Sequence, residues 1–394
     1  MKSPETPSDL RGVAGAGSDL AGLPETRFGI LGTDVRLRTD SAQIRSFFRH
    51  AYRWFPPDED GETLEAVALL GSGATSGPVA LAGDRRMDLA GSPSPENQAF
   101  LFLLGAITDS VGGSLMLHGA AVSLGGAGVI LAGPAFAGKS TLVVELMKRG
   151  ALFMSDDAAP LDRTTGLLHP YPRAIGIRKS AGRERPEGAL SGAAALELPH
   201  RWLVDPEALG ARLPVPSCPP RFLFYLDPGG WATGREGSEV RYEIALASEP
   251  EGLRDELRRI GARQIEPRPA QPFPLLSFTV PREGGTAAGL GDLQARHRES
   301  VLYIEEIRPP VPRPAGPPDL EKVSVSSLLI LLARDLLNRG EGSRLMKAHG
   351  GKAASLLFEL GALLRGVNAY LVSAGSAIDL AETVTDIVRA GDAP

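Results

Sequence analysis

The sequence predicts an α/β fold whose centre is one strand–helix–strand unit, and three observations carry this prediction. Residues 128–132 are a short apolar strand, Gly-Val-Ile-Leu-Ala, and residues 141–148 open a helix. A second short strand, residues 152–155, follows that helix. A crossover of this length is right-handed, so we expect the two strands to be parallel. With 394 residues and a hydrophobic fraction of 43%, the chain is long and apolar enough for a packed core.

The residues before this unit are predicted to form a tail and a small module. Residues 1–26 are rich in small residues and proline, so we expect a disordered tail. Alternating and apolar runs at residues 35–38 and 66–70 predict a small α/β module over residues 27–109. The aromatic and basic run at residues 47–54 favours a core plus its surface over a nucleic-acid-binding face.

The residues after the unit continue the main domain, which we expect to span residues 110–308. Residues 180–220 are rich in Ala, Gly, Pro and Arg and predict a long loop with one or two short helices. Residues 221–226 predict a strand, and residues 301–304 are a further candidate. Proline-rich residues 309–318 predict a stiff linker. Leucines at helical spacing predict a helical segment over residues 319–394, explained by packing or by contact with a partner.

Charge and cysteine content exclude several classes of protein. The chain has 42 Lys and Arg and 47 Asp and Glu, so its net charge of −5 gives no case for nucleic acid or anionic membrane as a partner. The single Cys218 excludes an intramolecular disulfide framework and a Cys-rich zinc site. The first residues lack the apolar core of a signal peptide or anchor, so we expect a cytoplasmic protein.

The run between the first strand and the helix satisfies the P-loop (Walker A) pattern G-x-x-x-x-G-K-[ST]. It reads Gly133-Pro134-Ala135-Phe136-Ala137-Gly138-Lys139-Ser140-Thr141. Its glycines let backbone N–H groups approach phosphate oxygens, and the helix that follows presents its positive end to them. We expect Lys139 to reach the β- and γ-phosphates of ATP and Ser140 to bind Mg²⁺. The alternative is a chance match, and Phe136 either covers the nucleotide or packs.

Two adjacent carboxylates, Asp156 and Asp157, follow the second strand. If that strand is parallel to the first, its carboxyl end lies on the phosphate side of the sheet. One carboxylate then serves as a base for an attacking hydroxyl, and the other binds the metal. A solvated turn is the alternative, but the neighbouring P-loop favours a functional pair.

A histidine is predicted to lie near the P-loop through a hairpin. Residues 115–124 read as a strand, and Gly125-Gly126 is a two-residue turn signal. If Leu124 faces Ala127, His118 lies opposite Gly133, whereas a slip of one residue would turn its ring to the other face. Histidine carries charge near pH 7, so a functional role and a buried structural role both remain open.

These residues resemble the catalytic domain of the HPr kinase/phosphorylase family, bacterial serine kinases whose P-loop fold is related to phosphoenolpyruvate carboxykinase. The resemblance covers about 65 residues, from Ser114 to Ile177. It rests on His118-Gly119, the hairpin, the P-loop, Arg149-Gly150 and Asp156-Asp157. It implies that Asp156 activates a serine hydroxyl, that Asp157 and Ser140 lie on the magnesium side, and that His118 lies close to the reacting phosphate.

The chain departs from the family's pattern in two places. Thr141 stands where the family has Glu, and the family's Glu-Ile-Arg-Gly signature is answered only by Pro172-Arg173-Ala174-Ile175-Gly176-Ile177. The missing carboxylate disfavours phosphorylase activity and HPr as acceptor. The chain looks more similar to divergent HPr kinase-related proteins, whose acceptors are other serine-bearing peptides or proteins. Three basic residues could form an anion site near the acceptor, or, for the last two, a solvated loop: Arg173, Arg178 and Lys179.

Together, these observations predict an ATP-dependent, Mg²⁺-requiring kinase that transfers a γ-phosphate to a hydroxyl of a peptide or protein, most simply a serine. The predicted catalytic residues are Asp156, His118 and Lys139. One alternative is a nucleotide-gated binding protein without phosphotransfer, with residues 320–390 as the partner-binding arm. The other is a small-molecule kinase or carboxykinase-like enzyme. No nucleic acid or membrane partner is expected, and a homo-oligomer is compatible with the resemblance, since the family forms rings.

Overall fold

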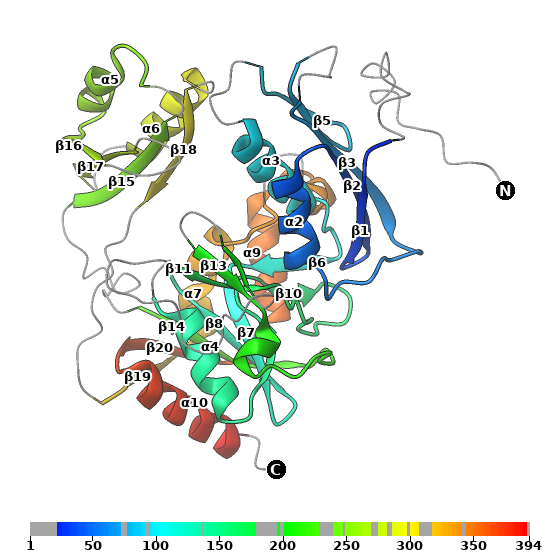
Figure 1. Cartoon of the computed structure of the whole chain (residues 1–394). Coiled ribbons are helices and arrows are strands. Elements are labelled where there is room, and N and C mark those ends of the chain that lie inside the picture. The colour runs from blue at the N-terminus through cyan, green and yellow to red at the C-terminus, as the bar shows by residue number, and fades with distance from the viewer. Residues whose placement is uncertain are drawn as a thin grey trace.

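Helices and strands follow one another in a mixed α/β arrangement, as predicted (Figure 1). The computed structural model describes residues 22–71, 77–90, 95–134, 137–178, 195–197, 201–227, 239–246, 249–268, 275–281, 286–297, 300–306, 317–339 and 343–391. Across these ranges, no helix has both the length and the apolar character needed to cross a lipid bilayer. The predicted tail lies outside the described residues up to residue 21, and the first strand already begins at Glu25.

The N-terminal sheet has five strands in chain order, and only its β2–β3 pair is parallel. Two helices accompany it, and Ser41 begins the first of them by accepting a hydrogen bond from the Ile44 N–H. Phe28 of the first strand stacks on Tyr52, at the end of that helix, with ring centroids 4.5 Å apart. The elements are β1 (Glu25–Ile30), β2 (Thr33–Thr39), α2 (Ala42–Ala51), β3 (Glu62–Leu69), β4 (Val79–Ala82), β5 (Arg85–Asp88) and α3 (Pro95–Asp109).

The central sheet has six strands in the order β19-β20-β14-β8-β7-β9. They are β7 (Gly119–Leu124), β8 (Ala127–Ala132), β9 (Leu152–Ser155), β14 (Pro220–Leu226), β19 (Asp319–Val323) and β20 (Asn368–Ala374). Strands β8, β14 and β20 are parallel, whereas β7 is antiparallel to both β8 and β9. The predicted common direction of β8 and β9 is therefore confirmed, with β7 lying between them. The carboxyl ends of four strands meet at one edge of this sheet.

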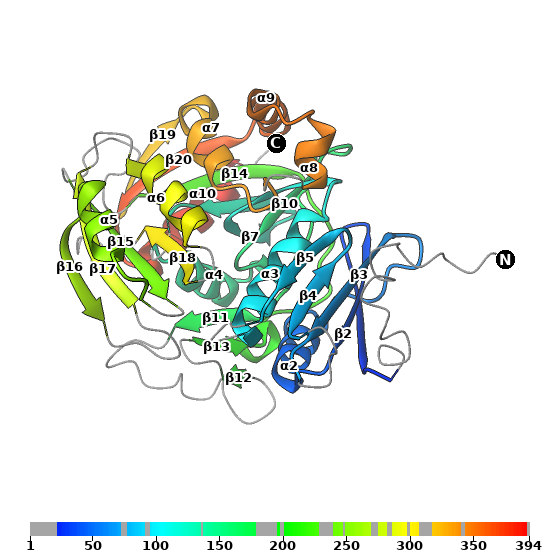
Figure 2. The same cartoon turned by 90° about the horizontal axis from the view of Figure 1, so that it is seen from above.

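Helices cover both faces of the central sheet (Figure 2). On one face lie α4 (Lys139–Lys148) and α10 (Ala377–Gly391), packed against Val129 and Leu131 of β8. On the other lie α7 (Val325–Arg334) and α9 (Ala353–Leu363), packed against Ile130. Helix α4 ends as predicted, because Gly150 takes a φ of 93° that favours glycine.

The prediction of a wholly helical C-terminal segment is wrong at two strands, β19 and β20. Strand β20 lies inside the central sheet, between β19 and β14. Its sequence, Asn-Ala-Tyr-Leu-Val-Ser-Ala, becomes a strand because it pairs with a neighbour on each side. Pairing with distant strands is not visible in the local sequence pattern from which the helices were predicted. The predicted linker lies outside the described residues up to residue 316.

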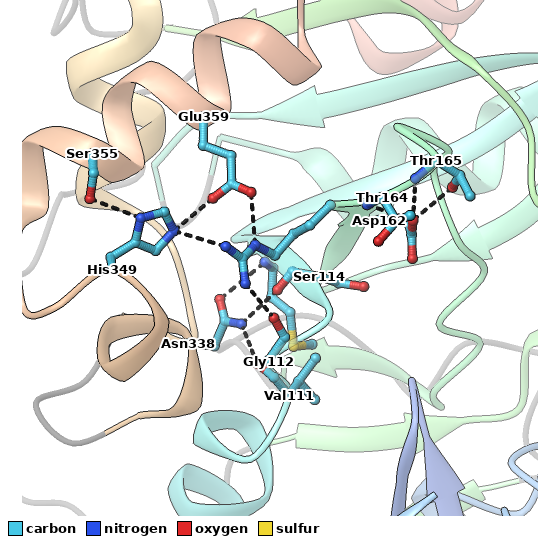
Figure 3. A network of polar contacts seen from close by, with 12 residues as sticks. Val111, Gly112, Ser114, Asp162, Thr164, Thr165, Asn338, His349, Ser355 and Glu359 are labelled. Carbon is cyan, nitrogen blue, oxygen red and sulfur yellow. Dashed lines mark hydrogen bonds and ion pairs between the residues drawn. The ribbon is translucent and has the colours of Figure 1, made fainter. Parts of the chain in front are cut away.

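A polar network holds this C-terminal segment against the strand pair β6 (Ser114–Leu117) and β10 (Ala159–Asp162) (Figure 3). Arg163 donates to Glu359 at 2.8 Å and to the Gly112 carbonyl at 3.0 Å. His349, after the short helix α8 (Arg344–Ala348), contacts Glu359 at 2.6 Å and Ser355 at 2.8 Å. The Asn338 amide bonds to the backbone of three residues, Val111, Ser114 and Met116. The chain leading to His118 is thereby fixed.

The prediction of a long loop over residues 180–220 is wrong where the chain forms a small sheet. Strands β11 (Ile175–Arg178), β12 (Ala195–Glu197) and β13 (Arg201–Val204) pair in the order β11-β13-β12. The chain returns to pair with β11, so distant partners again decide the outcome. The short 3₁₀ helix η3 (Pro206–Leu209) agrees with the predicted short helix, and residues 179–194 and 198–200 lie outside the described residues.

Residues 239–306, which were predicted to be part of one domain over residues 110–308, form a further unit with its own sheet and core. Its antiparallel strands pair in the order β16-β17-β15-β18 around one hydrophobic core. This βαββαβ order is that of the ferredoxin-like split βαβ arrangement. Strand β18 confirms the candidate strand at residues 301–304. The elements are β15 (Glu239–Leu246), α5 (Leu253–Arg259), β16 (Arg263–Arg268), β17 (Leu275–Pro281), α6 (Thr286–Arg296) and β18 (Val301–Glu306).

Candidate functional site

The P-loop residues lie between β8 and α4, as the motif predicts. Gly133 has a φ of 134°, and a Cβ atom there would lie 2.4 Å from the Leu226 carbonyl oxygen, so only glycine fits. Gly138, at φ 86°, is the N-cap of α4, and no side chain of the described residues caps this helix start. The first N–H groups of α4 therefore point toward the loop, which is the arrangement that binds phosphate. Ala135 and Phe136 lie outside the described residues.

Lys139 is buried within this loop. Its Nζ donates to the Gly133 carbonyl at 2.8 Å and to the Pro134 carbonyl at 3.0 Å. The ammonium group is thus held on the inner side of the loop, although it begins the helix. Thr141 is exposed on α4, whereas Ser140 is partly buried and lies close enough to Asp156 to influence its pKa.

Asp156 lies at the carboxyl end of β9, on the same edge of the sheet as the P-loop. It is buried, and its Oδ2 accepts a hydrogen bond from the Gly176 N–H at 3.1 Å. Its other oxygen, Oδ1, is buried without a hydrogen-bond partner. Burial raises the pKa of this carboxyl to about 6, and the charge of Asp157 adds to the rise, against the lowering effects of Ser140 and Lys139. At pH 7 it is ionised but unusually basic, as a general base requires.

Asp157 is half exposed and stands between two basic side chains. Its Oδ2 lies 3.6 Å from Nη2 of Arg173, and its Oδ1 lies 3.9 Å from Nε2 of His118. Both distances exceed a normal hydrogen bond. Neither Arg173 nor His118 therefore makes a short hydrogen bond to this carboxylate.

His118 lies where the chain passes from β6 to β7. The predicted hairpin register is confirmed, since Leu124 pairs with Ala127. The predicted strand 115–124 is nevertheless interrupted, because the ladder ends at Gly119 and the His118 N–H donates instead to the Asp335 carbonyl at 2.9 Å, so His118 does not pair with Gly133. Burial and the charge of Lys139 lower the pKa of His118. The ring is therefore neutral at pH 7 and faces Asp157.

Arg173 is the predicted basic residue that the structure brings to the site. Its guanidinium carbon lies 5.5 Å from the ring centre of Tyr52 and 5.9 Å from that of Tyr171. Tyr52 comes from the end of α2, so the N-terminal sheet unit contributes directly to this part of the site. Sequence reasoning missed both tyrosines, because their contact depends on packing between distant segments.

The two other predicted basic residues are not placed at the site. Arg178 is the last residue of β11, and its side chain lies outside what the structure describes. Lys179 lies wholly outside the described residues. Their predicted contact with an acceptor therefore stays a prediction.

Asp227 is a candidate that sequence reasoning missed. It follows β14, the strand next to β8, and is 1% exposed, with its N–H donating to the Val372 carbonyl at 2.7 Å. The signal was present, because six residues rich in apolar side chains, 221–226, lead directly to an Asp. An Asp at the end of such a strand beside a P-loop holds Mg²⁺ in many nucleotide-hydrolysing enzymes.

The chemistry of this edge fits a nucleotide with a magnesium ion. The uncapped start of α4 suits phosphate, and the unpartnered Oδ1 of Asp156 has unused acceptor capacity. Within the described ranges, no group of three or more His, Cys, Asp or Glu side chains is arranged to hold a metal ion alone. Magnesium bound to phosphates usually takes only one or two protein ligands, so a hydroxyl and a carboxylate such as Ser140 and Asp157 suit it.

Comparison with known proteins finds a local similarity. A segment of 57 residues is 39% identical to an HPr kinase/phosphorylase from Alkaliphilus metalliredigens (strain QYMF). It covers 14% of this chain and 18% of the length of that protein. No protein-family model matches the chain. The similarity is thus to a kinase/phosphorylase, over a small part of both sequences.

Proposed function

We propose that this protein is an ATP-dependent kinase of the HPr kinase-like type, which phosphorylates a hydroxyl, most simply that of a serine, in a peptide or protein. The observation that carries the proposal is the buried carboxyl of Asp156, with its pKa of about 6 and an unpartnered oxygen, at the strand edge that holds the P-loop. The local similarity to an HPr kinase/phosphorylase supports it.

In the proposed reaction, the carboxylate of Asp156 accepts the proton of the acceptor hydroxyl. The hydroxyl oxygen bonds to the γ-phosphorus, the bond to the β-phosphate oxygen breaks, and ADP leaves. Lys139 and the N–H groups at the start of α4 hold the phosphates, and the neutral ring of His118 donates a hydrogen bond near the transferred group. Ser140 and Asp157 would hold a magnesium ion, which would neutralise phosphate charge. Catalysis is mainly positioning and charge stabilisation.

The decisive experiment replaces the base and leaves the P-loop intact. Asp156→Asn is expected to reduce transfer by a factor on the order of 100 to 10,000 while ATP binding is retained. Mass spectrometry of a serine-peptide pool incubated with ATP and Mg²⁺ measures the gain of one phosphoryl group. Asp386→Asn, on the exposed side of α10, is the matched control. If Asp156→Asn transfers phosphate at the wild-type rate, the assignment of the base is wrong.

The pH dependence gives a second test of the same assignment. Because Asp156 must be ionised to accept a proton, we expect the wild-type rate to fall about tenfold per pH unit below pH 6. Nucleotide affinity measured at each pH separates this effect from loss of binding. Tight ATP binding with no transfer to any acceptor at any pH would support the nucleotide-gated binding protein instead.

A further inference from the structure

A cavity of about 380 Å³ lies between the N-terminal sheet unit and the segment that carries Arg173. Its apolar walls include Trp54, Phe55 and Pro56 on one side and Pro170, Pro172 and Pro214 on the other. The first wall is held against β1, since the Gly29 N–H donates to the Pro56 carbonyl at 2.9 Å. A Cβ atom at position 29 would lie 2.6 Å from that oxygen, so glycine is needed for this wall. We call this space the proline-lined cavity.

The wall of the proline-lined cavity is continuous with the candidate site. Tyr171 lies in the chain between two of its prolines, and the ring of Phe55 packs against it at 5.1 Å. The Tyr171 ring in turn lies under the Arg173 guanidinium, which faces Asp157. The Tyr171 N–H donates to the carbonyl of Met154, two residues before Asp156. Tyr171 therefore links the wall of the cavity to the strand that leads to the proposed base.

The lining of the proline-lined cavity contains one charged side chain. Asp58 lines it, and no ion pair of the Asp58 carboxylate occurs among the described residues. Glu59 and Asp60 follow it on the same loop and are exposed, outside the cavity lining. Of the basic residues next to the lining in the sequence, Arg53 is paired with Asp205 at 2.6 Å and Arg173 faces Asp157, whereas Arg212 is exposed. An apolar interior with the carboxylate of Asp58 in its lining complements a bulky apolar side chain accompanied by a cation.

We propose that the proline-lined cavity docks the acceptor: it takes a bulky apolar side chain of the acceptor peptide or protein, and Asp58 pairs with a basic residue of the same segment. This inference rests on the proposed kinase function and adds the chemical class of the acceptor to it. It assigns Trp54, Phe55 and Asp58 to recognition, at a distance from the reacting atoms.

The test uses the full chain and a defined set of labelled ten-residue peptides. Each carries one Leu, Phe or Met placed one to four positions from an Arg, with Gly and Ser elsewhere. The matched peptides have Ala for the apolar residue or Glu for Arg. We expect fluorescence anisotropy to show binding that weakens at least fivefold with either change. Asp58→Asn is expected to remove most of the preference for Arg over Glu, whereas Asp60→Asn, outside the cavity lining, should keep it.

Two further measurements keep the proposal independent of folding and of catalysis. Pro57 is exposed at the cavity, so Pro57→Arg should weaken binding of the Arg peptides and leave ATP affinity unchanged. The proposal is overturned if no peptide binds with a Kd below 1 mM, or if the Ala and Glu peptides bind as well as the others. Peptide binding without phosphate transfer would support the docking site and contradict the proposed kinase function. Phosphate transfer with a peptide KM that neither Asp58→Asn nor Pro57→Arg changes would support the kinase function and contradict the docking site.

Discussion

Two polar clusters of this molecule contain the same kinds of side chain and are built in different ways. In the first, Arg163, His349, Ser355 and Glu359 contact one another at 2.6–2.8 Å, apart from 3.3 Å between Arg163 and His349 (Figure 3). In the second, Asp157 lies 3.6 Å from Arg173 and 3.9 Å from His118, and Asp156 keeps a buried oxygen without a partner. The first cluster is held together by short contacts, whereas in the second Asp157 makes no contact this short with Arg173 or His118.

The largest effect is expected at the P-loop, which lies beside the second cluster, and it is a change in nucleotide affinity. Lys139→Ala removes the ammonium group of the P-loop and should weaken ATP binding on the order of 100-fold, since hydrogen bonds to charged groups contribute about 1.5–3 kcal/mol each. Lys148→Ala, in the exposed last turn of α4, is the control and should change it little. Isothermal titration with ATP and Mg²⁺ measures both. Equal ATP affinities for the two variants would show that the P-loop lysine does not contribute to nucleotide binding.

A substitution in the first cluster should lower the free energy of unfolding and leave ATP binding unchanged. Glu359→Gln leaves Arg163 and His349 without their carboxylate, and we expect the free energy of unfolding to fall by about 2 kcal/mol, below the full cost of a buried pair because Arg163 and Glu359 are partly exposed. Urea denaturation measures the change, with the exposed Glu382→Gln on α10 as control. ATP affinity should stay the same. A stability equal to that of the control would show that the network contributes no more than a surface ion pair.

At the candidate site, replacing a carboxylate should raise the free energy of unfolding instead of lowering it. The pKa of Asp156 is raised in the folded protein to about 6, so the folded state favours the protonated carboxyl and loses stability as the pH rises from about 4 to 6. Asp156→Asn cannot ionise and should therefore be more stable than the wild type above pH 7, by on the order of 2 kcal/mol. The gain should vanish below about pH 4. Thermal unfolding at pH 4 and pH 8 checks this, and a loss of stability at pH 8 would contradict it.

The parts of the fold that sequence reasoning predicted are those decided by neighbours along the chain. The register of the β7–β8 hairpin follows from two glycines at its turn, and the end of α4 follows from Gly150. The strand before the P-loop and the direction of β9 were also predicted, because a crossover of this length has one usual hand. These signals are local, so they persist whatever else the chain does.

The parts that were missed depend on partners far away in the sequence. Strand β20 and the β11-β13-β12 sheet exist because distant segments pair with them. His118 was predicted to pair across the hairpin, but the chain leaves that ladder for the carbonyl of Asp335. The tyrosines around Arg173 come from two units of the fold. Asp227 is different, since its pattern was visible in the sequence beside the predicted strand.

The place of β20 in the central sheet affects how the chain folds during synthesis. Strand β14 pairs with β8 on one side and with β20 on the other, yet β20 is translated long after both. Until it emerges from the ribosome, β14 presents an unpaired edge to any strand that can add to it, a known route to misassembly. Such late, long-range pairing is also slow. We therefore expect nascent chains that end before β20 to aggregate or to be bound by chaperones, even though the P-loop and its helix are already made.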